Sequence, residues 1–273
     1  MEHVSRDSSS CQRPHLSDLP PPGGPVRVSV VIAALNEAEN LPHVLPRIPY
    51  WVDDVLLVDG HSSDGTVETA RALLPGIRVI DQEGSGKGAA LRSGFAAADG
   101  DIIVALDADG STDPAEIPAF VGALMAGADF AKGSRFLQGA GTTDMPFHRR
   151  LGNRGFVLLV RLLFGGGYTD LCYGYNAFWA STLPRLQLDC DGFEIETLMN
   201  VRALRAGLKI VEVASYESPR IHGSGRLRTI PDGWRVLRTI WREWSAALPI
   251  PRRSADGVAG TAVGSGAGPS ALA

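Results

Sequence analysis

The stretch that most constrains the fold is an apolar run followed at once by acidic residues. Residues 102–106 are five consecutive apolar residues, and Asp107-Ala108-Asp109-Gly110 follows them directly. A continuous apolar run of this length predicts a strand that is buried on both faces of a parallel sheet. Asp107 and Asp109 stand two residues apart at the end of that strand, so their side chains project from the same side of the chain.

Two carboxylates on one side of a chain repel each other, so the pair predicts a compensating cation. Magnesium-type ions prefer oxygen ligands and keep positions open for the phosphates of a substrate. The carboxyl edge of an open α/β sheet is also where such proteins bind ligands. The alternative is a solvated turn, because Asp and Gly are common after strands for local reasons. This motif alone leaves both interpretations open.

Short apolar runs alternate with longer helical patterns along the chain, which predicts an α/β protein with a mostly parallel sheet wrapped by helices. The expected strands are 28–33, 55–58, 77–80, 102–106, 174–179 and 208–214. One expected helix begins near residue 39, and the others span 66–74, 87–98, 114–125, 151–164, 194–206 and 231–248. The ends, 1–25 and 251–273, are rich in small residues, Ser and Pro, and are expected to be disordered tails around one domain, 26–250.

Composition excludes some function classes. The net charge is −4 and 21% of residues are charged, so no basic excess argues for nucleic-acid binding. Cys11, Cys172 and Cys190 are scattered without metal-ligand spacing, which predicts reduced thiols in a cytoplasmic protein. We expect no signal peptide and no membrane-spanning helix, because the longest apolar runs are too short.

Polar residues follow each of the first four expected strands, and this recurrence favours a ligand site over isolated turns. Asn36-Glu37 follows the first strand, residues 59–66 follow the second, residues 84–88 follow the third, and Asp107 and Asp109 follow the fourth. Parallel strands bring these ends to one rim, so they should line one cleft. The glycines at 84–88 are not a Walker A loop, because Asp81 stands where that pattern needs its first glycine.

The ordered set of motifs resembles family 2 glycosyltransferases of the GT-A fold, and most of all their dolichol-phosphate or polyprenyl-phosphate mannose synthase branch. In chain order the motifs are Asn36-Glu37, Asp59-x4-Asp64-Gly65-Thr66, Gly86-Lys87-Gly88, Asp107-x-Asp109 and Gly133-Ser134-Arg135. The resemblance covers about 28–244. It implies an inverting, metal-dependent enzyme that moves a sugar from a nucleotide-diphosphate-sugar, with GDP-mannose expected first, to a polyprenyl or dolichyl phosphate.

The resemblance also implies roles for single residues. Asp107 and Asp109 would hold Mg²⁺ or Mn²⁺ at the donor diphosphate, and residues 170–175 resemble the segment beside the reacting sugar. The expected catalytic residues are Asp109, Arg135, Asp170, Arg220 and Arg226. The expected substrate-binding residues are Ala34, Leu35, Asn36, Glu37, Asp59, Asp64, Lys87, Asp107, Ala108 and Arg149.

The chain departs from the family pattern at two places. Gly225-Arg226 replaces the family's Ser-Lys in the loop that begins at Arg220, and Arg keeps the charge but changes the geometry. Ser111 stands where some members offer a Gln to the metal. A haloacid-dehalogenase-like phosphatase shares the Asp-x-Asp-Gly motif, but places it near the start of the domain. A non-catalytic sugar-nucleotide-binding module is a third alternative, against which the intact acidic motif and Arg135 argue.

The acceptor decides what further chemistry is needed. A lipid phosphate is already anionic near neutrality and needs no strong general base. A hydroxyl acceptor would need one, and Asp170, Asp191 and Glu194 are the candidates.

The last expected helix has an unusual apolar stripe. Trp234, Leu237, Trp241, Trp244 and Leu248 fall on one helical face, and arginines flank it. Residues 202–253 hold eleven Lys or Arg against four Asp or Glu. The stripe either packs on the domain as core or lies at the headgroup boundary of a membrane. The second interpretation would make the protein peripheral at the inner face of the membrane.

Overall fold

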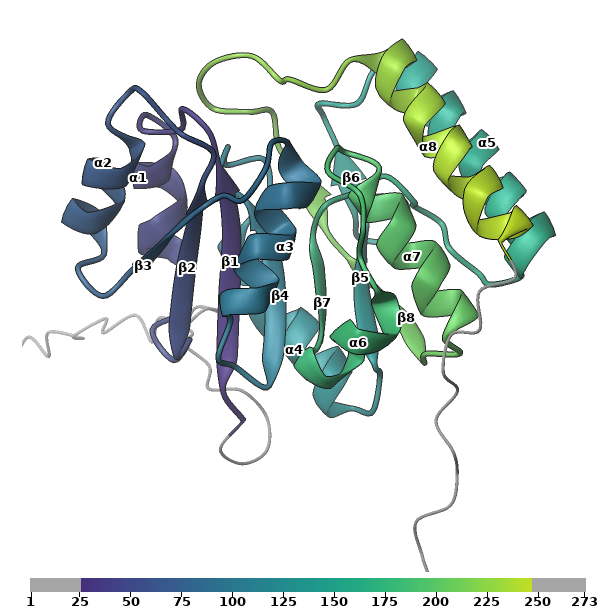
Figure 1. The fold of residues 1–273 in the computed structure, drawn as a ribbon, viewed down its shortest axis with the longest axis horizontal. Coiled ribbons are helices and arrows are strands. Elements are labelled where there is room, and N and C mark those ends of the chain that lie inside the picture. Colours follow the sequence, from purple (N-terminus) through teal and green to yellow (C-terminus); the bar gives the residue numbers. More distant parts are fainter. Residues whose placement is uncertain (1–25, 247–273) are drawn as a thin grey trace, which may run out of the picture.

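The computed structural model describes residues 26–246, and a seven-stranded sheet runs through them in the order β3-β2-β1-β4-β7-β5-β8 (Figure 1). The strands are β1 (Val28–Ala34), β2 (Asp54–Asp59), β3 (Arg78–Asp81), β4 (Ile102–Asp107), β5 (Phe130–Ser134), β7 (Asn176–Trp179) and β8 (Ile210–Ala214). Every neighbouring pair is parallel except those of β7, which lies antiparallel between β4 and β5. A separate parallel ladder joins β6 (Gly141–Thr142) to β9 (Tyr216–Glu217).

Helices cover both faces of the sheet. They are α1 (Leu41–Val44), α2 (Thr66–Leu73), α3 (Lys87–Ala97), α4 (Ile117–Met125), α5 (Phe147–Phe164), α6 (Leu183–Leu186), α7 (Ile195–Arg205) and α8 (Thr229–Ser245), with short 3₁₀ turns at Leu45–Arg47, Pro114–Glu116 and Ala180–Thr182. Side chains of α3 and α7 bury one face of the sheet, and those of α1 and α4 bury the other. α5 and α8 lie side by side at the β8 end of the molecule (Figure 1) and share a smaller core with α7.

The expected mostly parallel α/β architecture is confirmed, with two differences along the sheet. The strand expected at 174–179 exists as β7 but runs antiparallel, and β5 was not expected. Lys132 explains why β5 was not expected, because a lysine in the middle of a short segment interrupts the apolar pattern that predicts a strand. Its side chain is fully buried, and Nζ donates to the carbonyl oxygens of Gly133 at 2.7 Å and Tyr173 at 2.8 Å. Those hydrogen bonds allow a polar group inside the core.

Other sequence expectations lie outside the described residues. The expected tails 1–25 and 251–273, the last four residues of the expected domain, Leu248 and Cys11 are all among them. Between residues 26 and 246, no helix combines the length and the hydropathy needed to cross a bilayer.

The tryptophan stripe of α8 does not pack on the domain. Trp234, Trp241 and Trp244 are 67%, 60% and 48% exposed. The buried face of α8 is formed instead by Val236, Ile240 and polar residues such as Glu243. The interpretation of the tryptophans as core is therefore wrong for this structure, and the helix presents them to solvent.

A buried ion network holds α8 against α7. The carboxylate of Glu243, which is 2% exposed, accepts from Arg202 Nη2 at 2.8 Å and from Arg205 Nη1 at 2.6 Å. Arg202 also reaches the exposed carboxylate of Asp189 at 3.2 Å. Burial opposes the charged form of Glu243, but the two arginines hold its pKa below the ordinary value. The position of α8 therefore depends on a buried charge rather than on its tryptophans.

We predict that Glu243→Gln lowers the free energy of unfolding by about 3 kcal/mol at neutral pH, because it leaves Arg202 buried without its nearest carboxylate. Since folding lowers the pKa of Glu243, the stabilisation is present above the unfolded value of about 4.3 and is lost as the pH falls below it. Urea unfolding at several pH values measures both effects. Asp189→Asn, which removes the exposed partner of the same arginine, should cost less than about 1 kcal/mol. Equal losses in the two variants would contradict this account.

Candidate active site

The carboxyl ends of β1, β2 and β4 open into a cleft of about 550 Å³, closed on its far side by α5 and by the segment that leads into α8. Eleven of the expected site residues line it: Ala34, Leu35, Glu37, Lys87, Asp107, Ala108, Asp109, Arg135, Arg149, Arg220 and Arg226. Four others are not part of its lining: Asn36, Asp59, Asp64 and Asp170. Sequence reasoning missed several polar lining residues, among them Gln82, Asn153 and Glu217. Glu217 lies on a segment that lacks an apolar run ending in acids, so no strand-end signal marked it. Glu196, which also lines the cleft, belongs to the segment 193–196 that resembles the acidic helix start of family 2 glycosyltransferases, but it was not among the expected site residues.

Two basic side chains bridge four carboxylates at this edge. Lys87 Nζ, at the first residue of α3, lies 2.6 Å from Asp107 Oδ1 and 2.7 Å from Glu196 Oε1. On the other side of the cleft, Arg220 Nη1 lies 3.2 Å from Asp109 Oδ2, and its Nη2 pairs with Glu37.

The pKa values reflect this concentration of charge. Burial raises the pKa of Asp107 to about 6; Lys87 opposes the shift, and the charges of Asp109 and Glu196 add to it. Burial alone would lower the pKa of Lys87, but Asp107 and Glu196 raise it above its ordinary value. The edge is therefore an environment in which the carboxylates need positive charge nearby.

Gly174 makes this close approach feasible. A Cβ atom at this position would lie 2.7 Å from both Glu196 Oε1 and Lys87 Nζ, and 3.0 Å from Asp107 Oδ2. A side chain there would collide with the ion pairs. The glycine explains part of the 170–175 segment that the sequence singled out: it leaves room for the charges beside it.

Arg135 is held rigidly at the end of β5. Its Nε and Nη2 donate to the two carboxylate oxygens of Asp170 at 2.7 and 2.9 Å, and Nη1 donates to Glu217 Oε1 at 2.9 Å. The Tyr173 ring lies 4.7 Å from the guanidinium carbon. A guanidinium that makes two parallel hydrogen bonds to one carboxylate is held in a definite orientation. Arg135 thus reaches the cleft in one fixed orientation.

Asp170 is placed to position Arg135 rather than to take a proton. It is fully buried, and burial raises its pKa, but the guanidinium of Arg135 outweighs this and holds the pKa below its ordinary value. A carboxylate that is buried, paired and stabilised in its charged form is a weak general base. The other two candidate bases, Asp191 and Glu194, do not line the cleft either.

Asn36 and Asp64 join the loops that follow β1 and β2. The backbone N–H of Asn36 donates to Ser62 Oγ at 2.8 Å, and the backbone N–H of Ser63 donates to Asn36 Oδ1 at 2.8 Å. Asp64 accepts from the amide N of Ala38 at 3.0 Å. Asn36 has a φ of 56°, in the left-handed region that Asn tolerates better than most residues. These two residues shape the rim of the cleft without lining it.

Asp59 ends β2 beneath this rim. It is 6% exposed, and its Oδ2 accepts from the Ser62 amide N at 3.0 Å. Its Oδ1 has no hydrogen-bond partner among the described residues. A buried acceptor without a partner is costly, so a donor group that reached this atom would be bound favourably.

The segment between β9 and α8 crosses the cleft. Arg226 Nη2 donates to the carbonyl oxygen of Leu35 at 2.9 Å, which connects this segment to the end of β1. Arg149, in the first turn of α5, donates from Nη2 to the Leu227 carbonyl oxygen at 3.0 Å. Both guanidiniums also line the cleft, so this segment and the start of α5 bring positive charge to it.

The donor set fits a magnesium-type ion that takes most of its ligands from a substrate. Within residues 26–246, no three His, Cys, Asp or Glu side chains are grouped to hold a metal by themselves. Mg²⁺ is commonly bound through one or two carboxylates together with substrate phosphates, and the hard oxygen donors of Asp107 and Asp109 suit that arrangement. Lys87 and Arg220 carry the compensating charge in this structure.

Comparison with known proteins places this chain among enzymes. The model of the family "Glycosyl transferase family 2" matches residues 29–183. An undecaprenyl-phosphate mannosyltransferase of Micrococcus luteus is 34% identical over 200 residues, covering 69% of this chain and 82% of that protein. A dolichol-phosphate mannosyltransferase of Pyrococcus furiosus is 31% identical over 255 residues, covering 88% of this chain and 71% of that protein.

Solved structures agree with the sequence comparison. Glucosyl-3-phosphoglycerate synthase from Mycobacterium tuberculosis, in complex with Mn²⁺, UDP-glucose and phosphoglyceric acid, superposes with a TM-score of 0.65 at 26% identity. The match covers 81% of this chain and 80% of that one. The same enzyme has also been solved with Mg²⁺ and UDP. By its family match, its relatives and its GT-A fold, the chain belongs to glycosyl transferase family 2.

Proposed function

We propose that this glycosyltransferase moves mannose, with inversion, from GDP-mannose to a polyprenyl phosphate. The observation that carries the acceptor assignment is the positive charge that Arg149 and Arg226 bring to the cleft, which suits an anionic acceptor. A phosphate is already ionised near neutrality and needs no strong general base, and none of the three candidate bases, Asp170, Asp191 and Glu194, lines the cleft. The mannosyltransferases among the relatives, whose names include undecaprenyl phosphate and dolichol phosphate, support the same acceptor class.

The donor diphosphate binds at the acidic edge in this proposal. Asp107 and Asp109 hold Mg²⁺ or Mn²⁺, and a bound cation of this kind would neutralise the negative charge that develops on the departing diphosphate. Arg220 and Arg226 add positive charge from the segment that crosses the cleft. Groups that are fixed in place before the reaction stabilise such developing charge most effectively.

The nucleoside binds over the ends of β1 and β2. Asp59 Oδ1, buried and unpartnered, accepts an N–H of the base, and Glu37 lies at the same end of the cleft. Guanine and uracil both carry a ring N–H, so Asp59 suits either base. The choice of GDP-mannose therefore follows the mannosyltransferase relatives rather than this contact.

The protein binds to the inner face of the membrane without crossing it. The support is the exposed face of α8, with Trp234, Trp241 and Trp244, and the five exposed arginines of α5 and α8. The only acidic residues of these two helices, Asp232 and Glu243, are buried. Tryptophan and arginine favour the boundary between headgroups and acyl chains, and each basic residue near an anionic leaflet contributes about 1 kcal/mol.

A soluble phosphorylated acceptor is the second candidate. It is favoured by the likeness to glucosyl-3-phosphoglycerate synthase, which was solved with UDP-glucose and phosphoglyceric acid. That acceptor also carries a phosphate, so the arginines of the cleft suit it as well.

Donor binding and product formation test the proposal together. GDP-mannose with Mg²⁺ should raise the melting temperature, since a ligand at 100 times its Kd stabilises a fold by about 2.7 kcal/mol. The protein should then form mannosyl-phosphoryl-polyprenol from GDP-mannose and a polyprenyl phosphate in detergent. Stabilisation by UDP-glucose alone, with transfer only to phosphoglyceric acid, would favour the second candidate and contradict the first.

We predict that Asp107→Asn and Asp109→Asn each abolish transfer and the Mg²⁺-dependent part of the thermal shift, while the protein stays folded. Both changes keep the side-chain shape and remove a charged ligand at the edge of the cleft. Asp99→Asn, which alters an exposed carboxylate paired with Arg78, is the matched control and should behave like the unmodified protein. Full activity of either edge variant in the presence of chelator would refute the metal site.

Arg226→Ala should lower kcat by on the order of 10²-fold, comparable to the loss of one fixed charge-stabilising donor. Its side chain is exposed, with one hydrogen bond, to Leu35, so stability should change little. Arg228→Ala provides a control, because Arg228 is an exposed arginine of the same segment that does not line the cleft. Steady-state kinetics with saturating donor measure the effect. If the two variants turn over equally, Arg226 has no role at the phosphates.

Sedimentation with vesicles tests the membrane proposal. The protein should bind phosphatidylglycerol vesicles more strongly than phosphatidylcholine vesicles, and salt should weaken the binding. The double change Trp241→Ala and Trp244→Ala should reduce it, whereas Tyr50→Ala, at an exposed aromatic residue away from α8, should not. Failure to bind either vesicle at low salt would contradict a membrane location.

A further inference from the structure

The crossing segment, residues 218–228 between β9 and α8, lies over the cleft with little support of its own. It contains no helix or strand, and residues 221–226 are all exposed. In Figure 1 it is the long loop that leads into α8. Backbone that buries so little surface opens locally at a low free energy unless other parts of the fold hold it. The contacts that hold this segment therefore decide where Arg220 and Arg226 lie.

One buried side chain pairs with the backbone of the crossing segment. Asn40, in the turn between β1 and α1, is 1% exposed. Its Oδ1 accepts from the backbone N–H of His222 at 2.8 Å, and its Nδ2 donates to the carbonyl oxygen of the same residue at 3.2 Å. An amide side chain suits this role because it carries a donor and an acceptor side by side. The two hydrogen bonds join residues that are 182 positions apart in the sequence.

The same amide also holds the partner of Arg220. Asn40 Nδ2 donates to Glu37 Oε2 at 2.6 Å, and the other oxygen of that carboxylate, Oε1, pairs with Arg220 Nη2. Arg220 Nε in turn donates to the carbonyl oxygen of His222 at 2.7 Å. Two of the groups that orient the guanidinium, the carboxylate of Glu37 and the carbonyl of His222, are therefore both fixed by Asn40.

Close packing at the end of β4 supports the same position. The backbone N–H of Ile221 donates to the carbonyl oxygen of Asp109 at 3.3 Å. A Cβ atom at Gly110 would lie 2.5 Å from Ile221 Cδ1, so only a glycine lets this side chain approach. The crossing segment thus meets the acidic edge by direct contact, next to the residue that Asn40 holds.

We infer that Asn40 is a positioning residue, which fixes the crossing segment over the cleft and thereby places Arg220. Asn40 does not line the cleft, so it acts through other residues and not on a substrate. The place of the segment follows from these contacts alone. The effect of Asn40 on turnover rests on the proposed function, in which Arg220 adds positive charge at the donor diphosphate.

Limited proteolysis with trypsin tests the position of the segment without any substrate. Arg220, Arg226 and Arg228 are the trypsin sites of the segment, and cleavage at such sites follows the population of the open form. Asn40→Ala should speed cleavage after these residues at least tenfold, as measured by mass spectrometry well below the melting temperature. It should also lower kcat about tenfold, because an open segment carries Arg220 away from the donor.

Two further variants separate this role from a general loss of stability. Asn40→Asp keeps the size of the side chain and the acceptor for the backbone of the segment, so it should fold even where Asn40→Ala does not. It should also speed the cleavage, because it places a carboxylate oxygen where Nδ2 donates to Glu37. Ser29→Ala is the matched control at the amino end of β1. It removes two buried hydrogen bonds, to Asp54 and from the backbone N–H of Gly100, and should change neither the cleavage nor kcat.

The outcomes separate the role of Asn40 from the proposed function. Cleavage that is unchanged in both Asn40 variants, or equally accelerated in Ser29→Ala, would overturn the inference. Faster cleavage with an unchanged kcat would overturn the placing of Arg220. No transfer of mannose by the unmodified protein would overturn the proposed function alone, because the cleavage needs no substrate and kcat can then be measured with UDP-glucose and phosphoglyceric acid.

Discussion

Two cations carried by distant parts of the chain hold together the acidic edge on which the site depends. Lys87 joins Asp107 to Glu196, and Arg220 joins Asp109 to Glu37. Without positive charge the four carboxylates would repel one another at the end of a buried sheet, where the dielectric screening is weak. The same requirement makes the edge suited to a divalent cation and a diphosphate. In the proposed function, a divalent cation bound with the diphosphate would supply positive charge where Lys87 and Arg220 now supply it.

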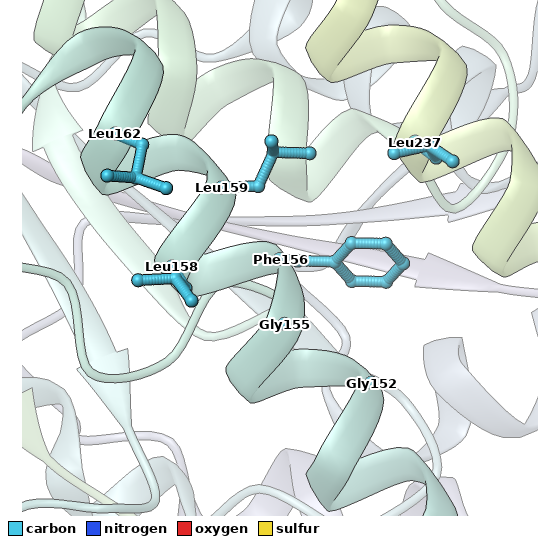
Figure 2. A pocket seen from close by; sticks show the side chains of 7 residues that line it. All are labelled: Gly152, Gly155, Phe156, Leu158, Leu159, Leu162 and Leu237. Carbon is cyan, nitrogen blue, oxygen red and sulfur yellow. The ribbon is translucent and has the colours of Figure 1, made fainter.

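The side of the cleft formed by α5 and the segment leading into α8 differs in its chemistry. There Arg149 and Arg226 line the cleft together with Asp144 and Asp232, and an apolar groove lies nearby between α5 and α8 (Figure 2). α8 is fixed to α7 through the buried carboxylate of Glu243, which leaves its tryptophans free to face outward. In the proposed function, the acidic edge would take the donor diphosphate with its metal ion, and the arginines on the side of α5 would take an anionic acceptor.

Much of this could be predicted from the sequence, because local patterns carry it. Apolar runs located β1, β2 and β4, and the polar residues after them located the rim of the cleft. β5 could not be found this way, since the buried Lys132 interrupts its pattern and is tolerated only through carbonyl groups supplied by the fold. The antiparallel direction of β7 is likewise set by its neighbours and not by its own residues.

The partners of the site residues could not be predicted from local sequence patterns either. Lys87 and Glu196 are 109 positions apart, and Arg135 and Glu217 are 82 apart, so only the folded chain brings them together. Asp170 illustrates the consequence. Its sequence context suggested a catalytic carboxylate, whereas its complete burial against Arg135 makes it a positioning residue. The exposure of Trp234, Trp241 and Trp244 also could not be read from their periodicity, which suits a core face equally well.

The most direct test of the account is a crystal structure with Mn²⁺ and GDP, with the metal located by its anomalous scattering. The account predicts one strong peak between Asp107 and Asp109, in contact with the diphosphate, and Arg220 moved away from Asp109 toward the phosphates. A diphosphate bound in the cleft with no peak at these two aspartates, or with Arg220 still paired to Asp109, would contradict it.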